Sequence, residues 1–118
     1  MKVEFIFRHK GQKLNVAEIQ NFVNQKLAEF PFKGLCESVT QMSKWLVVLV
    51  DFPDLKAHPR TYHEPVELWW EVLAGYIALQ FNVRFLHWEV HNETRSLIYH
   101  MEWRERNFQG LTLQKNWG

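Results

Sequence analysis

Residues 44–52 read Lys-Trp-Leu-Val-Val-Leu-Val-Asp-Phe, and this stretch decides the fold that the sequence predicts. Its middle, Trp45 to Val50, is apolar at every position, so both faces of a strand built from it are apolar. That pattern is typical of a strand inside a sheet with both faces covered. The chain is therefore expected to be built around a sheet, with residues 44–52 as a central strand.

The segments around this strand carry further strand patterns. Val3, Phe5 and Phe7 alternate with other residues, which is the pattern of a half-buried strand. Residues 35–41 contain small polar side chains, so that strand is expected at an edge of the sheet. Strands are therefore expected at residues 2–8, 35–41, 44–52, 83–91 and 96–104, with a short additional strand at 110–114.

Two helices are predicted between these strands. Asn15 and Glu18 form a capping pair at the start of the first helix, whose apolar residues recur every three or four positions until Pro31. The second helix spans about residues 65–82. The resulting order is β-α-β-β-α-β-β, so a single α+β domain covering residues 1–118 is expected. Its predicted architecture is a ferredoxin-like split βαβ sandwich, an antiparallel sheet with the helices on one face.

The second helix is apolar around most of its circumference. Only Glu67, Glu71 and Gln80 interrupt it, and the two carboxylates are expected to form its solvated stripe. Trp69 and Trp70 point about 100° apart on a helix, so one sheet cannot bury both rings completely. A face this wide implies burial against the sheet and against a second surface. The residues expected to bind a partner are Trp69, Trp70 and Tyr76.

The composition is that of a globular protein and argues against several classes. Of the 118 residues, 47% are apolar and 23% are charged, and the formal net charge of +1 makes nucleic-acid binding an unfavourable interpretation. The longest apolar stretch carries two carboxylates, so no membrane span is expected. Cys36, the only cysteine, excludes an intramolecular disulfide and is expected to be a small buried residue. These features predict a cytoplasmic protein.

The last predicted hairpin gathers histidine and glutamate side chains. If its apolar rows share one face, the register pairs His87 with His100 and places the polar residues on the other face. Imidazole nitrogens and carboxylates are suitable ligands for zinc or another divalent transition metal. The alternative interpretation is the ordinary polar face of an amphipathic hairpin. The candidate metal ligands are His87, Glu89, His91 and His100.

Aromatic residues make up 15% of the chain and include six Trp and nine Phe, more than the core of a small domain needs. With the wide apolar helix, they favour a protein-binding module that occupies a partner's surface, with an inhibitor or immunity-type protein as the leading example. A homodimer has the same features and stays open. Because the sequence holds no glycine-rich phosphate loop, Gly-x-Ser-x-Gly turn or Cys-x-x-Cys pair, no catalytic residue and no cofactor are predicted. The alternative is a small ferredoxin-like enzyme or ligand-binding protein that uses histidines as metal ligands or acid–base groups.

Overall fold

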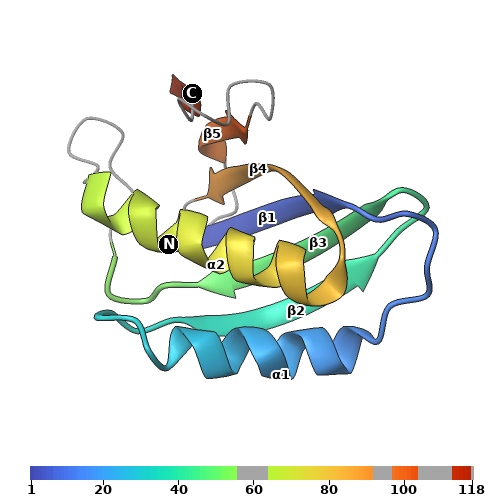
Figure 1. Cartoon of the computed structure of the whole chain (residues 1–118). Coiled ribbons are helices and arrows are strands. Elements are labelled where there is room, and N and C mark those ends of the chain that lie inside the picture. Colours follow the sequence, from blue (N-terminus) through green and yellow to red (C-terminus); the bar gives the residue numbers. More distant parts are fainter. Residues whose placement is uncertain (56–63, 92–96, 104–112, 118) are drawn as a thin grey trace.

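The computed structural model describes the backbone of residues 1–55, 64–91, 97–103 and 113–117, and the side chains of residues 1–55 and 66–91. In chain order the elements are β1 (Lys2–Arg8), α1 (Val16–Leu27), β2 (Leu35–Gln41), β3 (Trp45–Asp51), α2 (Glu64–Phe81), β4 (Arg84–His91), β5 (Leu97–Trp103) and β6 (Leu113–Trp117). The strands form one sheet in the order β2-β3-β1-β4-β5-β6, and all neighbours are antiparallel (Figure 1). The predicted α+β class with an antiparallel sheet and two helices is confirmed, and residues 110–112 of the expected last strand lie outside the described residues. No helix among the described residues is long and apolar enough to cross a membrane.

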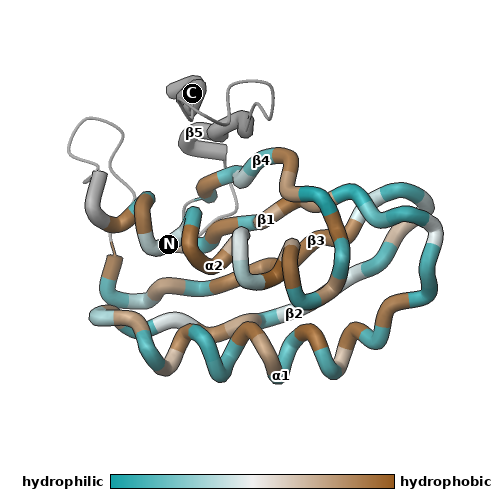
Figure 2. Tube along the Cα trace, in the orientation of Figure 1, coloured by the Kyte–Doolittle hydropathy of each residue, from teal (hydrophilic) through white to brown (hydrophobic). Residues whose placement is uncertain are grey.

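Both helices pack on the same face of the sheet and share one hydrophobic core with it (Figure 1). Val3, Phe5 and Phe7 of β1 are fully buried in this core, as their alternation predicts. Figure 2 shows how polar and apolar residues alternate along α1, which produces a single buried stripe on that helix. The core residues of the helices are Ile19, Val23 and Leu27 in α1 and Trp70, Leu73, Ala74 and Ile77 in α2.

Polar side chains fix the ends of the helices. The Asn15 side chain accepts a hydrogen bond from the Glu18 backbone N–H at 3.1 Å, as the predicted cap requires. After α2, Asn82 adopts a φ of 54°, the left-handed conformation that commonly ends a helix and that Asn tolerates. Its side-chain oxygen accepts a hydrogen bond from Lys10 Nζ (3.0 Å), and its carbonyl accepts one from Gln12 Nε2 (3.1 Å). These bonds tie the start of β4 to the loop that follows β1.

β3 lies between β2 and β1, as expected, but the helices cover only one of its faces. Val48 and Val50 are fully buried on the helix side. On the opposite face Trp45 is 37% exposed and Val47 is half-buried. In the part of the chain that the structure describes, no helix packs on that side, yet Leu49 on the same face is only 6% exposed. The expectation of two covered faces therefore stays a prediction, and the face of the sheet away from the helices is called the open face below.

The final hairpin keeps the predicted rows but not the predicted pairing. Trp88 is fully buried, as the register argument requires, and its Cα partner is Met101. The expected pairing of His87 with His100 is wrong, because the register is shifted by two residues and His87 lies opposite Glu102. Since strand residues alternate with a period of two, a shift by two leaves the same rows opposed.

Candidate functional site

The outer face of α2, turned away from the core, and its flank carry most of the exposed large hydrophobic residues of the described helices. Its inner face is fully buried at Trp70, Leu73 and Ile77. The outer face follows positions 68, 72, 75 and 79, which recur at helical spacing. The exposed hydrophobic residues on and beside it are Leu68 (54%), Trp69 (36%), Val72 (43%), Tyr76 (40%) and Leu79 (86%).

Two of the predicted partner-binding residues, Trp69 and Tyr76, lie on the flank of α2 that faces α1. The ring centroid of Trp69 is 5.0 Å from that of Phe30, and Lys26 Nζ lies 4.5 Å from the ring centroid of Tyr76. These contacts hold both rings in place, while more than a third of each side chain stays exposed. The flank therefore presents two ordered aromatic rings at the surface.

Trp70, the third predicted partner-binding residue, belongs to the core. Its ring stacks on Phe52 at 5.6 Å and meets Trp88 edge to face at 5.4 Å. The expectation that a single surface cannot bury both neighbouring tryptophans is confirmed, since Trp69 is exposed and Trp70 is not. A ring with no exposed surface cannot contact a partner, so Trp70 drops out of the predicted binding surface.

The two carboxylates of α2 do not form the expected solvated stripe. Glu67 is only 1% exposed, because it lies three residues before Trp70 and seven before Ala74, on the buried face. Glu71 is half-buried on the side of the helix. Neither occupies positions 68, 72, 75 or 79, so the outer face of α2 carries no charge along its centre.

A cluster of Glu4, Glu89 and His91 on the open face of the sheet is the second candidate site. Glu89 and His91 are alternate residues of β4, and Glu4 reaches them from β1, where its Cα partner is Glu89. His91 Nε2 lies 3.6 Å from Glu4 Oε1 and 4.0 Å from Glu89 Oε2. All three ligand atoms lie within 4.8 Å of one another. The His91 side chain is 13% exposed and that of Glu4 18%, so the cluster is largely shielded from water.

The cluster includes two of the four predicted metal ligands and adds one that the sequence did not indicate. His87 stands beside it, with Nε2 4.0 Å from Glu89 Oε1. His100 has its Cα opposite Glu89, but its side chain lies outside the described residues. Glu4 is missing from the predicted set, although its polar position in the alternating first strand is visible in the sequence. The predicted ferredoxin-like fold places these two strands side by side, but spacing along the chain does not set the register between strands this far apart, so the pairing of Glu4 with Glu89 was not predicted.

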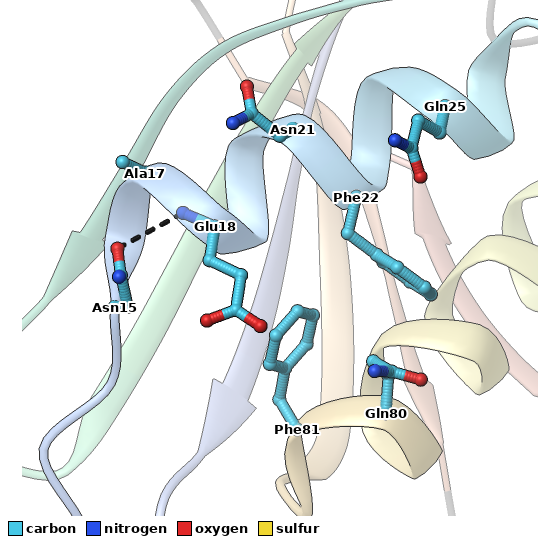
Figure 3. Close-up of a pocket in the computed structure, with 8 residues that line it drawn as sticks. All are labelled: Asn15, Ala17, Glu18, Asn21, Phe22, Gln25, Gln80 and Phe81. Carbon is cyan, nitrogen blue, oxygen red and sulfur yellow. Dashed lines mark hydrogen bonds between the residues drawn. The ribbon is translucent and has the colours of Figure 1, made fainter.

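A hollow of about 420 Å³ lies between α1 and the end of α2 (Figure 3). Phe22 and Phe81 meet edge to face at 5.3 Å in its wall. Glu18 is the one titratable residue of its lining. A single carboxylate without a second acid, base or nucleophile beside it offers no basis for a catalytic assignment.

Cys36 is buried, as expected for a small core residue. Burial raises the pKa of its thiol from 9.0 to about 11, against a smaller lowering by the hydrogen bond to the Ser38 carbonyl. The thiol is therefore protonated near neutral pH, which makes it a poor nucleophile and a poor metal ligand.

We expect the folded protein to react with Ellman's reagent at about pH 8 far more slowly than the unfolded chain does. A pKa raised by about two units leaves about a hundredfold less thiolate, and burial adds a barrier to access. Absorbance of the released thiol anion, followed with and without denaturant, measures both rates. Cys36→Ser supplies the zero-signal control, and equal rates in the two states would contradict the burial of this residue.

The chain matches no known family model, no curated protein and no solved structure. The case for a function therefore rests on the two surfaces described above.

Proposed function

We propose that this chain is a protein-binding module that docks through the outer face of α2, and that the protein it binds is a second copy of itself. The observation that carries the proposal is an uncharged, exposed apolar face on a helix whose inner face already supplies the core. Leu79 is 86% exposed, so folding of the monomer buries little of its apolar surface. Of the residues on this face, it would therefore bury the largest share of its surface under a covering partner. Contiguous apolar surface of this kind is typical of protein-binding sites.

The spacing of the residues on the outer face supports docking of a second copy, because it is the same when read in either direction along α2. Positions 68, 72, 75 and 79 are separated by four, three and four residues, so an antiparallel copy brings Leu68 opposite Leu79 and Val72 opposite Gly75. A side chain added at Gly75 would meet nothing within 4 Å. The valine of the second copy therefore has room to approach the helix backbone closely. One two-fold axis through the middle of α2 satisfies both pairs.

The aromatic flank of α2 supports the same arrangement. In an antiparallel pair related by that axis, each flank of the helix meets the same flank of the second copy. Trp69 of one copy therefore comes close to Tyr76 of the other, on both sides of the axis. Aromatic residues near the centre of an interface commonly supply much of its binding energy. An inhibitor or immunity-type protein would use the same residues against a different protein, and the oligomeric state separates the two.

We expect the wild-type chain to sediment as a dimer at micromolar concentration and Leu79→Glu to sediment as a monomer. The carboxylate would be placed in the apolar contact opposite Leu68 of the second copy, where desolvation opposes association. Since Leu79 is exposed in the monomer, the melting temperature of a dilute sample should change little. Analytical ultracentrifugation measures the association, and thermal denaturation measures the stability of the fold.

Gln80→Glu is the matched control for this experiment. It adds the same charge to the same turn of α2, at an exposed position beside the outer face, and should still form dimers. A monomeric wild type would contradict the second copy and favour the inhibitor or immunity-type role. Dimers in Leu79→Glu would show that another surface forms the contact.

The fold itself is proposed to be a ferredoxin-like split βαβ sandwich. The order β2-β3-β1-β4, antiparallel throughout, supports this assignment, as do the two helices that connect β1 to β2 and β3 to β4. β5 and β6 extend the sheet beyond β4. A cytoplasmic location is proposed as well, and the lone, buried cysteine supports it.

A further inference from the structure

β2 stands at one end of the described strand order, so one of its backbone edges faces away from the sheet. α1 runs alongside this edge, on the side of β2 opposite to β3 (Figure 1). The outward N–H and C=O groups of an edge strand can pair with a strand of another chain and extend the sheet. The groups that cover the outer edge of β2 therefore decide whether the sheet can grow on this side.

Two side chains of α1 cover the first half of this edge. Asn24 Oδ1 accepts a hydrogen bond from the Cys36 backbone N–H at 2.9 Å. Gln20 Nε2 donates to the Cys36 carbonyl at 2.9 Å and to the Glu37 carbonyl at 3.4 Å. Gln20 and Asn24 are four residues apart, so both amides extend from the same face of the helix. Together they give Cys36 the acceptor and the donor that one residue of a neighbouring antiparallel strand would give it.

The loop before α1 covers the other end of the edge. Gln41 Oε1 accepts a hydrogen bond from the Leu14 N–H at 3.0 Å, and Gln41 Nε2 donates to the Gln12 carbonyl at 2.7 Å. Between Cys36 and Ser38 the register with β3 shifts by one residue, which marks a bulge. Bulges disturb the flat edge that strand addition needs. The outer edge of β2 is therefore obstructed at both ends, by α1 and by the loop.

We propose that Gln20 and Asn24 keep the outer edge of β2 closed to strand addition, and that without them this edge pairs with the same edge of a second copy. Two identical edges can pair in the antiparallel sense about a two-fold axis, because each supplies both the donors and the acceptors that the other needs. Both amides are half-buried beside the strand. The proposal does not depend on the outer face of α2, which is a separate surface.

The test is the double variant Gln20→Ala/Asn24→Ala, made in the Leu79→Glu background so that the outer face of α2 contributes little to association. Asn21→Ala/Gln25→Ala in the same background is the matched control, because it removes the same two types of side chain from exposed positions of the same helix. We expect the double variant to associate at an about tenfold lower concentration than the background, which corresponds to about 1.4 kcal/mol. Sedimentation measures this difference, and the control should sediment as the background does.

Hydrogen–deuterium exchange shows whether the new contact lies at β2. The backbone amides of residues 38–41 should exchange more slowly in the associated double variant than in the control. Association without slower exchange there would overturn the proposal, because another surface would then form the contact. A folded double variant that sediments as the background does would overturn it as well, and so would equal association of the control.

Single variants decide the matter if the double variant fails to fold. Asn24→Leu removes the acceptor for the Cys36 N–H and should associate more strongly than the background. Asn24→Asp has nearly the same shape and keeps the acceptor, so it should sediment as the background does. Gln20→Ala removes the donor to two carbonyls and should again promote association. Sedimentation of Asn24→Leu and Gln20→Ala at the background value would overturn the proposal.

Discussion

Val48→Asp is expected to abolish folding. Val48 is fully buried in β3, with Phe5 of β1 and Val39 of β2 as its Cα partners. An aspartate there would place an unpaired carboxylate in the core beneath the helices. Burial of such a charge costs several kcal/mol, comparable with the roughly 5–15 kcal/mol that stabilises a typical domain. Far-UV circular dichroism and a denaturant titration measure the result.

Val47→Asp is the matched control, one residue away on the open face of the sheet. Val47 is half-buried there, so the new carboxylate can reach water. The variant should lose about 1–2 kcal/mol of unfolding free energy and still unfold cooperatively. If Val48→Asp behaved like Val47→Asp, β3 would not be part of the core.

Trp70→Ala is expected to lower the unfolding free energy by about 3–5 kcal/mol, the usual cost of removing a buried aromatic ring. The ring fills the space between Phe52 and Trp88, and its loss leaves a cavity in the middle of the core. Trp69→Ala is the comparison, because the same truncation one residue earlier removes a ring that is 36% exposed. Its cost in unfolding free energy should be about 1 kcal/mol.

In self-association the order of the two tryptophan variants should be reversed, because Trp69→Ala should have the larger effect on binding although it has the smaller effect on stability. Truncation of an interface aromatic typically costs about 2 kcal/mol of binding free energy, or about a thirtyfold rise in Kd. Trp69→Ala should therefore stay folded and dissociate, as judged by sedimentation over a range of concentrations. If both variants only lowered the melting temperature and left association unchanged, the proposed binding surface would lose its main support.

Most elements of the fold could be predicted because local patterns produce them. The alternation of Val3, Phe5 and Phe7 and the Asn15 cap are read within a few residues, and both are found as expected. The apolar run of β3 was ambiguous for a physical reason. A strand with two covered faces and a strand with one apolar open face have the same sequence pattern, and the face of β3 away from the helices combines an exposed Trp45 with a buried Leu49.

The candidate sites were less predictable, since they depend on neighbours that are distant in the chain. Glu67 is buried because of where α2 lies on the sheet, which the helix pattern alone does not reveal. The predicted partner of His87 depended on where the hairpin turn is centred. Moving that centre by one residue changes the partner on the next strand by two residues. Glu4 joins Glu89 only because β1 pairs with β4. The face of the sheet on which a strand side chain lies could be predicted, whereas its partner on the neighbouring strand could not.

The position of β1 has a consequence for how the protein is made. β1 is synthesised first, yet it pairs with β3 on one side and with β4 on the other. Contacts this distant in the chain slow folding. A nascent chain that has reached only the end of α2 therefore still carries β1 with one unpaired backbone edge, beside the rings of Phe5 and Phe7. Unpaired edges next to apolar side chains recruit other chains, so we expect aggregation of the nascent chain to be most favoured during this interval of translation.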